Sequence, residues 1–335
     1  MIRSVPQLVS AAAIVLGVLL FGLTLAYIDL DETLDSAKRL GFALPAILLP
    51  SILWHLLRTW GWAVAFPDGA RPAFSRLFRV RLAADAIGFF TIRGLAGDAL
   101  KVVLLYDRVT PEICAASIAL ERAAFAIISI ALAGVISFAA ATRLALPHGW
   151  STFFMLTSLA ALVVLAAATQ IVRHRTGDYL GRFVARLDRW TGRTLEASRI
   201  VRFVLDVEHV LLDMLRGSRR RLIVLTLLPA VCYAVMAFEV WLVLWAVGVS
   251  AGAVATLAIE TFARLGSIAA AVIPGNIGAL EASNAAPVAM LGLGGGGALA
   301  LSRRIRALVW AALGLALYPR VTARPAGPSS PAASP

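Results

Sequence analysis

Long apolar stretches separated by short polar segments run through most of the chain. Six of them are about 20 residues long, the length at which a helix crosses the hydrocarbon core of a bilayer. The first follows Arg3, but it is too long for a signal peptide and no small-residue cleavage motif follows it, so we interpret it as an uncleaved span. The pattern predicts an all-α polytopic membrane protein with about six full transmembrane helices. They fall near residues 5–28, 42–66, 112–140, 151–172, 221–247 and 297–319.

Two further apolar regions, at about 77–106 and 253–293, are interrupted in the middle. The pieces on either side of each break are too short to cross the bilayer comfortably, so we expect two re-entrant helical hairpins. Irregular backbone at that depth must be buried in protein or line a cavity. The helix-breaking residues are Gly94 and Gly97 in the first region and Pro274, Gly275 and Gly278 in the second.

The distribution of arginine between the polar segments predicts the orientation. The segment 29–39 is mainly acidic, whereas Arg71, Arg76, Arg79 and Arg81 follow the second span and twelve arginines lie within 173–221. Because arginine and lysine accumulate on the cytoplasmic side, we expect both basic segments and both termini to be cytoplasmic.

The basic segment 173–221 also has apolar residues at helical spacing, for example Phe183, Leu187 and Trp190. It is therefore either an amphipathic linker on the anionic inner membrane surface or a solvated helical hairpin. We expect one membrane domain over 1–320, with its halves at about 42–140 and 221–319, and a disordered Pro/Ala/Ser tail at 321–335.

An internal repeat relates the two halves. A shift of 181 residues pairs Gly94 with Gly275 and Gly97 with Gly278. The same shift pairs Trp60 with Trp241 and aligns 119–122 with 300–303, which matches Arg122 with Arg303. Three full spans separate the two tryptophans, an odd number, so we expect the halves to have opposite orientation. Inverted repeats with broken helices are typical of transporters.

Composition agrees with a membrane protein and narrows its partners. Apolar residues make up 60% of the 335 residues and charged residues 15%, far from the composition of soluble proteins. The net charge of +12 sits mainly in a few segments between spans, so we interpret it as membrane orientation rather than nucleic-acid binding. Cys114, Cys232 and the four scattered histidines form no metal-ligand spacing, and we expect no cofactor, no metal and no catalytic constellation.

Charged residues inside the spans are the candidates for function, because each costs at least about 2.5–3.5 kcal/mol at bilayer depth. Guanidinium groups suit phosphate, so the cations predict a headgroup site for an anionic lipid. The acids either pair these arginines and cap the short helices, or couple transport to protons. Since neighbours on a helix point apart, Glu121 and Arg122 should have separate partners. The candidate cations are Arg58, Arg93, Lys101, Arg122, Arg303 and Arg304, and the candidate acids are Asp98, Glu121 and Glu281.

Lesser candidates are His55, Glu239, Glu260 and Arg264. We interpret His55 as a packed polar residue, and the last two as a possible pair at i and i+4.

These motifs resemble the transmembrane region of lysylphosphatidylglycerol synthases, also called the flippase-like family, over about residues 5–320. Ile92-Arg93 stands where the family usually has a proline. Full-length synthases carry an aminoacyl-transferase domain after the membrane region, whereas here a short tail follows that region. The resemblance therefore implies a stand-alone member that handles or translocates lipid. The motifs are Leu57-Arg58-Thr59-Trp60, Arg93-Gly94-x-x-Gly97-Asp98 with Lys101, Ala119-Leu120-Glu121-Arg122 and Pro274-Gly275-x-x-Gly278-x-x-Glu281.

The leading hypothesis is a flippase or transporter for an anionic phospholipid or isoprenoid lipid in a bacterial inner membrane. The alternatives are an accessory subunit with a protein partner from a lipid pathway, and an integral membrane enzyme of lipid or hopanoid metabolism.

Overall fold

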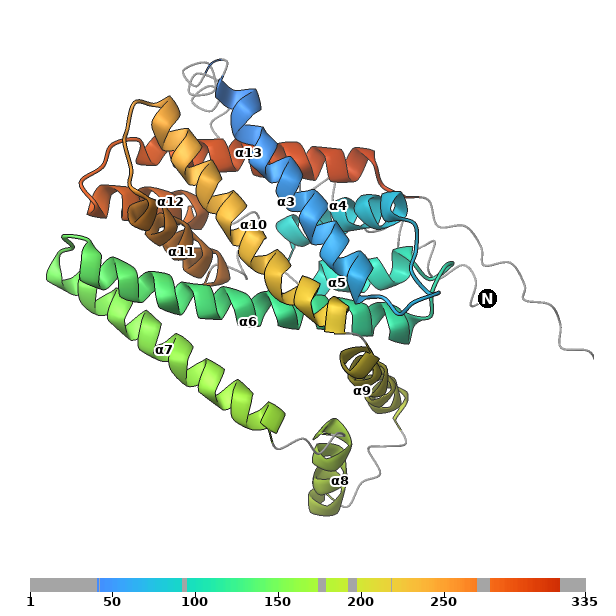
Figure 1. Ribbon diagram of the computed structural model, residues 1–335. Helices are drawn as coiled ribbons and strands as arrows, with labels where there is room; N and C mark the ends of the chain where they lie inside the picture. Colours follow the sequence, from blue (N-terminus) through green and yellow to red (C-terminus); the bar gives the residue numbers. More distant parts are fainter. Residues whose placement is uncertain are drawn as a thin grey trace, which may run out of the picture.

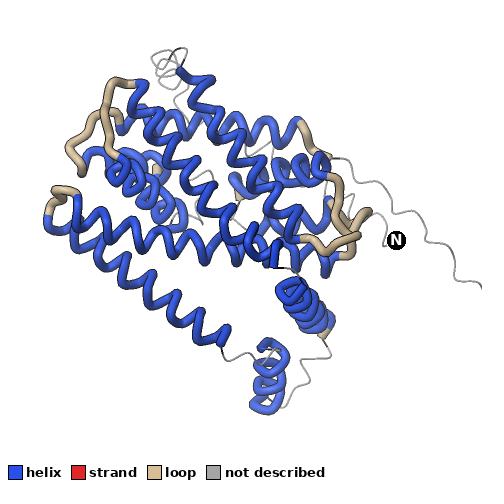
Figure 2. The backbone as a smooth tube through the Cα atoms, viewed as in Figure 1, coloured by secondary structure: helices blue, strands red, loops and turns tan. Residues whose placement is uncertain are grey.

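Helices make up the regular structure of the described residues (Figures 1 and 2). The computed structural model describes residue 41 and residues 43–91, 95–173, 179–191, 198–217, 219–269 and 278–319. The predicted first span at 5–28, the acidic segment 29–39, both break centres and the tail lie outside these ranges.

Five predicted spans are each one helix, so the periodicity located them to within a few residues. They are α3 (Ala43–Ala65), α6 (Pro111–Arg143), α7 (His148–Arg173), α10 (Arg219–Ala246) and α13 (Gly296–Ala316). Three helices of the described chain are long and apolar enough to cross a membrane, namely α6, α7 over His148–Ala167, and α10. α3 and α13 carry ionisable residues near their middle, Arg58 in one and Arg303 in the other.

The first interrupted region folds back on itself as α4 (Phe74–Phe90) and α5 (Leu95–Leu104). The Arg76 guanidinium donates to the Leu104 carbonyl at 3.0 Å, so the start of α4 lies beside the end of α5. A Cβ on Gly97 would stand 2.7 Å from the Ala84 carbonyl oxygen. Gly97 therefore lies inside α5 and permits close helix packing. Gly97 is the third residue of α5, and the centre of the predicted break, 92–94, lies outside the described residues.

The second interrupted region is likewise two helices that fold back, α11 (Ala253–Ala269) and α12 (Ala279–Met290). Gly266 of α11 lies against the Ser283 side chain of α12. Residues just before α11 and just after α12, such as Val249 and Leu291, pack on the same apolar core. The expected break at Gly278 is present, because this glycine has φ 77° immediately before α12.

Helices α3 and α10 form an antiparallel pair across the centre of the molecule (Figure 1). Ile47 at the start of α3 shares a core with Val243 near the end of α10. Gly61 near the end of α3 lies against Leu228 in the first part of α10. The two helices are therefore in contact along most of their length.

Contacts between helices follow the same order in two sets of four, α3–α6 and α10–α13. In each set the first helix contacts the second, the second contacts the third, the third contacts the fourth, and the first contacts the fourth. Between the sets, α4 contacts α13 as α11 contacts α6. α7, α8 (Tyr179–Thr191) and α9 (Arg199–Gly217) connect the sets, with α7 and α9 packed on α6.

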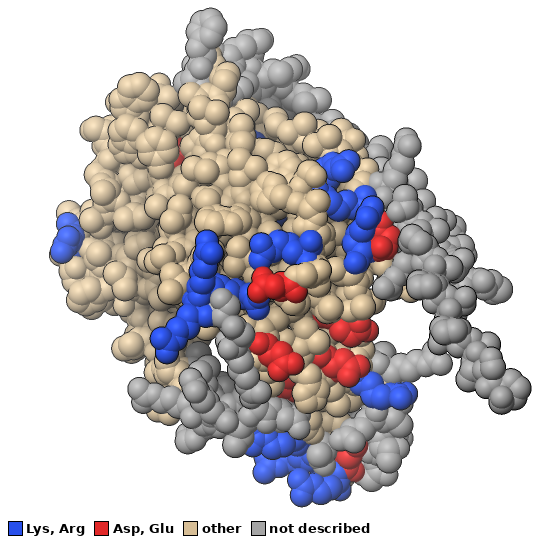
Figure 3. Space-filling view, turned by 45° about the vertical axis from the view of Figure 1, so that its right-hand side comes forward, with Lys and Arg blue, Asp and Glu red and all other residues tan. Residues whose placement is uncertain are grey.

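Basic residues gather at one end of the bundle, which we call the basic end. An ion pair of 3.5 Å between Arg76 and Asp107 and one of 3.7 Å between Arg221 and Asp68 bring the starts of α4, α6 and α10 together there. Charged side chains collect in the lower and right parts of the space-filling view, whereas its upper left is almost free of them (Figure 3). The outer faces of α6 and α7 expose residues such as Val135 and Leu162, as expected of helices in contact with lipid.

We expect Gly314→Ala to reduce stability, because its Cβ would stand 2.3 Å from the Leu82 carbonyl oxygen and force α13 away from α4. Overpacking of this kind costs about 1–3 kcal/mol. Gly149→Ala is the matched control, since a Cβ there meets nothing within 4 Å. Thermal unfolding in detergent checks this prediction, and equal melting temperatures for the two variants would contradict the packing described.

Candidate functional site

Neighbouring charges on α6 bind different helices. Glu121 forms an ion pair of 3.0 Å with Arg58 of α3 and lies 3.6 Å from Arg81 of α4. Arg122 points elsewhere and pairs with Asp98 of α5 at 2.6 Å. Because successive residues of a helix lie about 100° apart, one short stretch of α6 reaches the three other helices of its set.

In the second set, two adjacent arginines of α13 likewise pair with the three other helices. Arg303 pairs with Glu260 of α11 and lies 3.6 Å from Glu239 of α10. Arg304 pairs with Glu281 of α12. By their partners, Arg303 therefore corresponds to Glu121, and Arg304 corresponds to Arg122. The match of Arg122 with Arg303, which the shift of 181 predicts, is off by one residue.

Further ion pairs complete each group. Lys101 bonds Asp98 at 3.1 Å, and Arg81 lies 3.7 Å from Asp85. Arg264 pairs with Glu260 at 2.7 Å, as the spacing of i and i+4 predicts. The first cluster comprises Arg58, Arg81, Asp85, Asp98, Lys101, Glu121 and Arg122, and the second cluster comprises Glu239, Glu260, Arg264, Glu281, Arg303, Arg304 and Arg306, which pairs with Glu239.

Burial makes these pairs interdependent. Arg81, Glu121, Glu239, Glu260 and other members are almost completely buried. A charge withdrawn from water costs several kcal/mol, which attraction offsets only when a partner is present. Asp98 and Glu281 also lie in the first turns of α5 and α12, where a negative charge is stabilised by the positive end of the helix dipole. Ion pairs and the helix dipole thus both stabilise the negative charge of these two acids.

Phe125 of α6 lies between the two clusters. The Arg58 guanidinium stands 3.8 Å from the centre of its ring and the Arg264 guanidinium 5.9 Å. Arg264 also stands 4.3 Å from the Tyr233 ring, and the Tyr233 hydroxyl bonds Thr261. Cation–π contacts therefore connect the clusters across the boundary between the two sets of helices.

The remaining predicted residues have varied positions. His55 is buried with its ring centre 4.1 Å from that of Trp310, which is a packing role. Arg93, Gly94, Pro274 and Gly275 lie outside the described residues. Predicted site residues that the structure brings into the two clusters are Arg58, Asp98, Lys101, Glu121, Arg122, Glu281, Arg303 and Arg304.

Three cluster members were missed by the sequence analysis. Arg81 was assigned to a cytoplasmic segment, but it lies in α4 and is buried; this expectation is wrong because the hairpin helix begins seven residues earlier, at Phe74. Asp85 was not noticed, although its spacing of i+4 from Arg81 was a usable signal. Arg306 is not among the candidates from the sequence, yet it pairs with Glu239.

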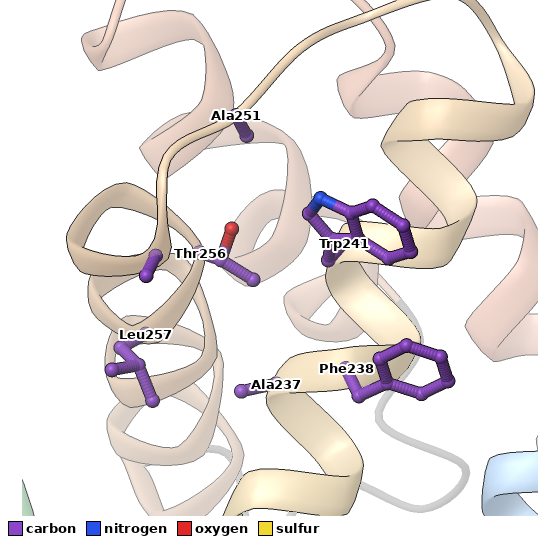
Figure 4. Close-up of a pocket in the computed structure, with 7 residues that line it drawn as sticks. Ala237, Phe238, Trp241, Ala251, Thr256 and Leu257 are labelled. Carbon is purple, nitrogen blue, oxygen red and sulfur yellow. The ribbon is translucent and has the colours of Figure 1, made fainter.

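An apolar groove of about 240 Å³ lies between α10 and α11, and its lining includes Ala237, Phe238 and Trp241 of α10 and Thr256 and Leu257 of α11 (Figure 4). Thr256 is four residues, about one turn, from Glu260 of the second cluster. The groove suits hydrocarbon, and it is distinct from the arginine-lined cavity predicted from the sequence, which stays a prediction. Among the described residues, no group of three or more His, Cys, Asp or Glu is arranged to hold a metal ion.

A family model for the lysylphosphatidylglycerol synthase TM region matches residues 10–316. The chain belongs to this family. No curated protein and no solved structure matches the chain. Membership indicates a multi-pass membrane protein tied to lipid metabolism or transport. Both ion-pair clusters lie within the residues that the family model matches.

We expect Glu121→Gln to destabilise this member of the synthase TM family by about 3–5 kcal/mol, because it leaves Arg58 and Arg81 buried without their shared carboxylate. Asp68→Asn is the control, since the Asp68 side chain is 88% exposed and stays hydrated, so that its ion pairs contribute little to stability. Thermal unfolding in detergent measures both. A melting temperature that falls no further for Glu121→Gln than for Asp68→Asn would contradict the role given to Glu121.

Proposed function

We propose that the protein moves an anionic lipid, a phospholipid or an isoprenoid phosphate, between the two leaflets of a bacterial inner membrane. The headgroup passes the arginines of the two clusters while the hydrocarbon chains stay in lipid or in the groove between α10 and α11. The observation that carries this proposal is the presence of two similar ion-pair clusters, one in each of two similarly connected sets of helices.

An inverted repeat is the first part of the proposal. Its support is the shared order of contacts in α3–α6 and α10–α13, together with the antiparallel course of α3 and α10. Ala65 and Ala246, the last residues of these two helices, are 181 residues apart, which is the shift that aligns the two breaks. A twofold axis in the membrane plane relates helices in this way, and such repeats underlie alternating access in transporters.

Two re-entrant hairpins are the second part. The α4–α5 hairpin begins and ends at the basic end, next to Arg76 and Asp107. The α11–α12 hairpin begins and ends at the opposite end, near Val249 and Leu291. By the distribution of basic residues the basic end is cytoplasmic, as are both termini, so one hairpin enters from each side.

An excess of cations in each cluster favours an anionic ligand. Among the described residues each cluster has four cations and three carboxylates, which leaves a formal charge of +1. A phosphate group bearing one negative charge balances that excess and offers oxygens for bidentate guanidinium bonds. The headgroup then replaces a carboxylate as the partner of an arginine, so that no buried charge is left bare during the exchange.

Arg122 is the first arginine that a headgroup would reach. Its side chain is 46% exposed, although it lies eleven residues, about 16 Å, into α6. Its partner Asp98 has a second cation, Lys101, at 3.1 Å. Arg122 is therefore free to turn to a phosphate without leaving Asp98 unpaired.

We expect Arg122→Ala to slow lipid movement in liposomes by about ten- to a hundredfold, the loss of one charge-assisted contact of 1.5–3 kcal/mol. The probe is fluorescent phosphatidylglycerol, or a fluorescent isoprenoid phosphate, whose outer-leaflet fraction is bleached by dithionite. Arg71→Ala is the matched control, because Arg71 has the same exposed fraction of 46% and pairs only at the surface with Asp68.

Two outcomes of this assay would contradict the proposed function. If well-folded wild-type protein moves neither probe faster than empty liposomes, or if Arg122→Ala and Arg71→Ala both match wild type, the proposed function is wrong. In that case an enzymatic or accessory role in lipid metabolism becomes the better account.

A further inference from the structure

The helices of the basic linker differ in what covers their apolar faces. In α9 the apolar residues, among them Val207, Leu211 and Met214, pack on Leu120 of α6 and Leu225 of α10. In α8 the apolar residues Phe183 and Trp190 are 60% and 88% exposed. α8 lies beside α9 and outside the bundle (Figure 1). One helix of the linker is thus docked on the protein, whereas the other presents two large aromatic side chains outward.

The sequence of α8 sorts its residues onto two faces. Phe183 and Trp190 are seven residues apart and share one face of the helix. Arg182, Arg186 and Arg189 form a separate stripe along the polar side. A helix with bulky apolar residues on one face and arginines on the other is suited to the boundary between headgroups and acyl chains.

The position of α8 brings it close to the membrane surface. α7 contains a segment able to cross the membrane, His148–Ala167, and ends at Arg173. Six residue steps separate Arg173 from Tyr179, the first residue of α8, a reach of at most about 20 Å. α9 leads directly to the start of α10 at the basic end, where Arg221 bonds the Met214 carbonyl at 3.3 Å. Both neighbours therefore hold α8 at the basic end.

We infer that α8 is an interfacial helix that lies in the headgroup layer of an anionic membrane, with Phe183 and Trp190 among the acyl chains and its three arginines among the headgroup phosphates. The occupant of the exposed face is the bilayer that the chain already spans. Aromatic side chains favour this depth, and cations near an anionic surface are held there electrostatically. The inference does not rest on transport, because it concerns a helix outside the two clusters.

The test measures the depth of nitroxide labels on the full chain in lipid vesicles. Native Cys114 and Cys232 are buried, so labels attach at introduced cysteines. Phe183→Cys places a label on the apolar face and leaves Trp190 in place. Gly181→Cys is the matched control, only two residues away but on the opposite face and without a change in charge. In phosphatidylglycerol vesicles we expect the label at 183 to favour collision with oxygen and the label at 181 to favour collision with a nickel chelate in water.

The charge requirement is tested separately. Vesicles of phosphatidylcholine alone should leave the label at 183 shallower, and replacement of Arg182, Arg186 and Arg189 by glutamine should remove the difference between the two lipids. Equal access of nickel to both labels in phosphatidylglycerol vesicles would overturn the inference and indicate a solvated helix or a missing protein partner. Equal depth in both lipids would overturn the requirement for anionic headgroups.

Discussion

Glu121 on α6 and Arg303 on α13 each bind two neighbouring helices through charge, and the rest of the interior depends on these two side chains. Removal of Glu121 would take the carboxylate from buried Arg58 and leave Arg81 with Asp85 alone. Removal of Arg303 would leave Glu260 with Arg264 and Glu239 with Arg306, so in both cases buried charges lose part of their compensation. The next residues along these helices, Arg122 and Arg304, form ion pairs with the short helices α5 and α12. Each long helix is thus the place where the other three helices of its set meet.

In the proposed transport, the two hairpins exchange ion-pair partners as the headgroup passes. A purely apolar interface would hold a short helix by shape, whereas an ion pair is replaced without loss when another ion takes the place of one partner. Asp98 lies between Lys101 and Arg122, so it retains a cation when Arg122 turns away. The two clusters are joined at Phe125, where Arg58 and Arg264 stand on the same ring. Phe125 is therefore a point of contact between the two clusters.

Much of this structure follows from the sequence. Apolar periodicity located five helices, and the glycine-containing breaks predicted that each interrupted region would form two shorter helices. That these helix pairs are re-entrant stays a prediction. Most cluster residues were recognised from the cost of charge at that depth. Their partners were not, since Arg58 with Glu121 and Arg303 with Glu260 join helices far apart in the chain. Arg81 was assigned to a polar segment because several arginines precede it in the sequence. The correspondence of Arg122 with Arg304 depends on helix packing, which a constant shift in sequence does not describe.

The proposed function requires the two similar halves to enter the membrane from opposite sides. Cysteine accessibility in intact inverted and right-side-out vesicles tests it most directly. Ser75→Cys lies at the start of the α4–α5 hairpin and Ser250→Cys just before the α11–α12 hairpin; both positions are exposed, and the native Cys114 and Cys232 are buried. The account predicts that a membrane-impermeant maleimide labels position 75 only from the cytoplasmic side and position 250 only from the opposite side. Labelling of both positions from the same side would contradict it.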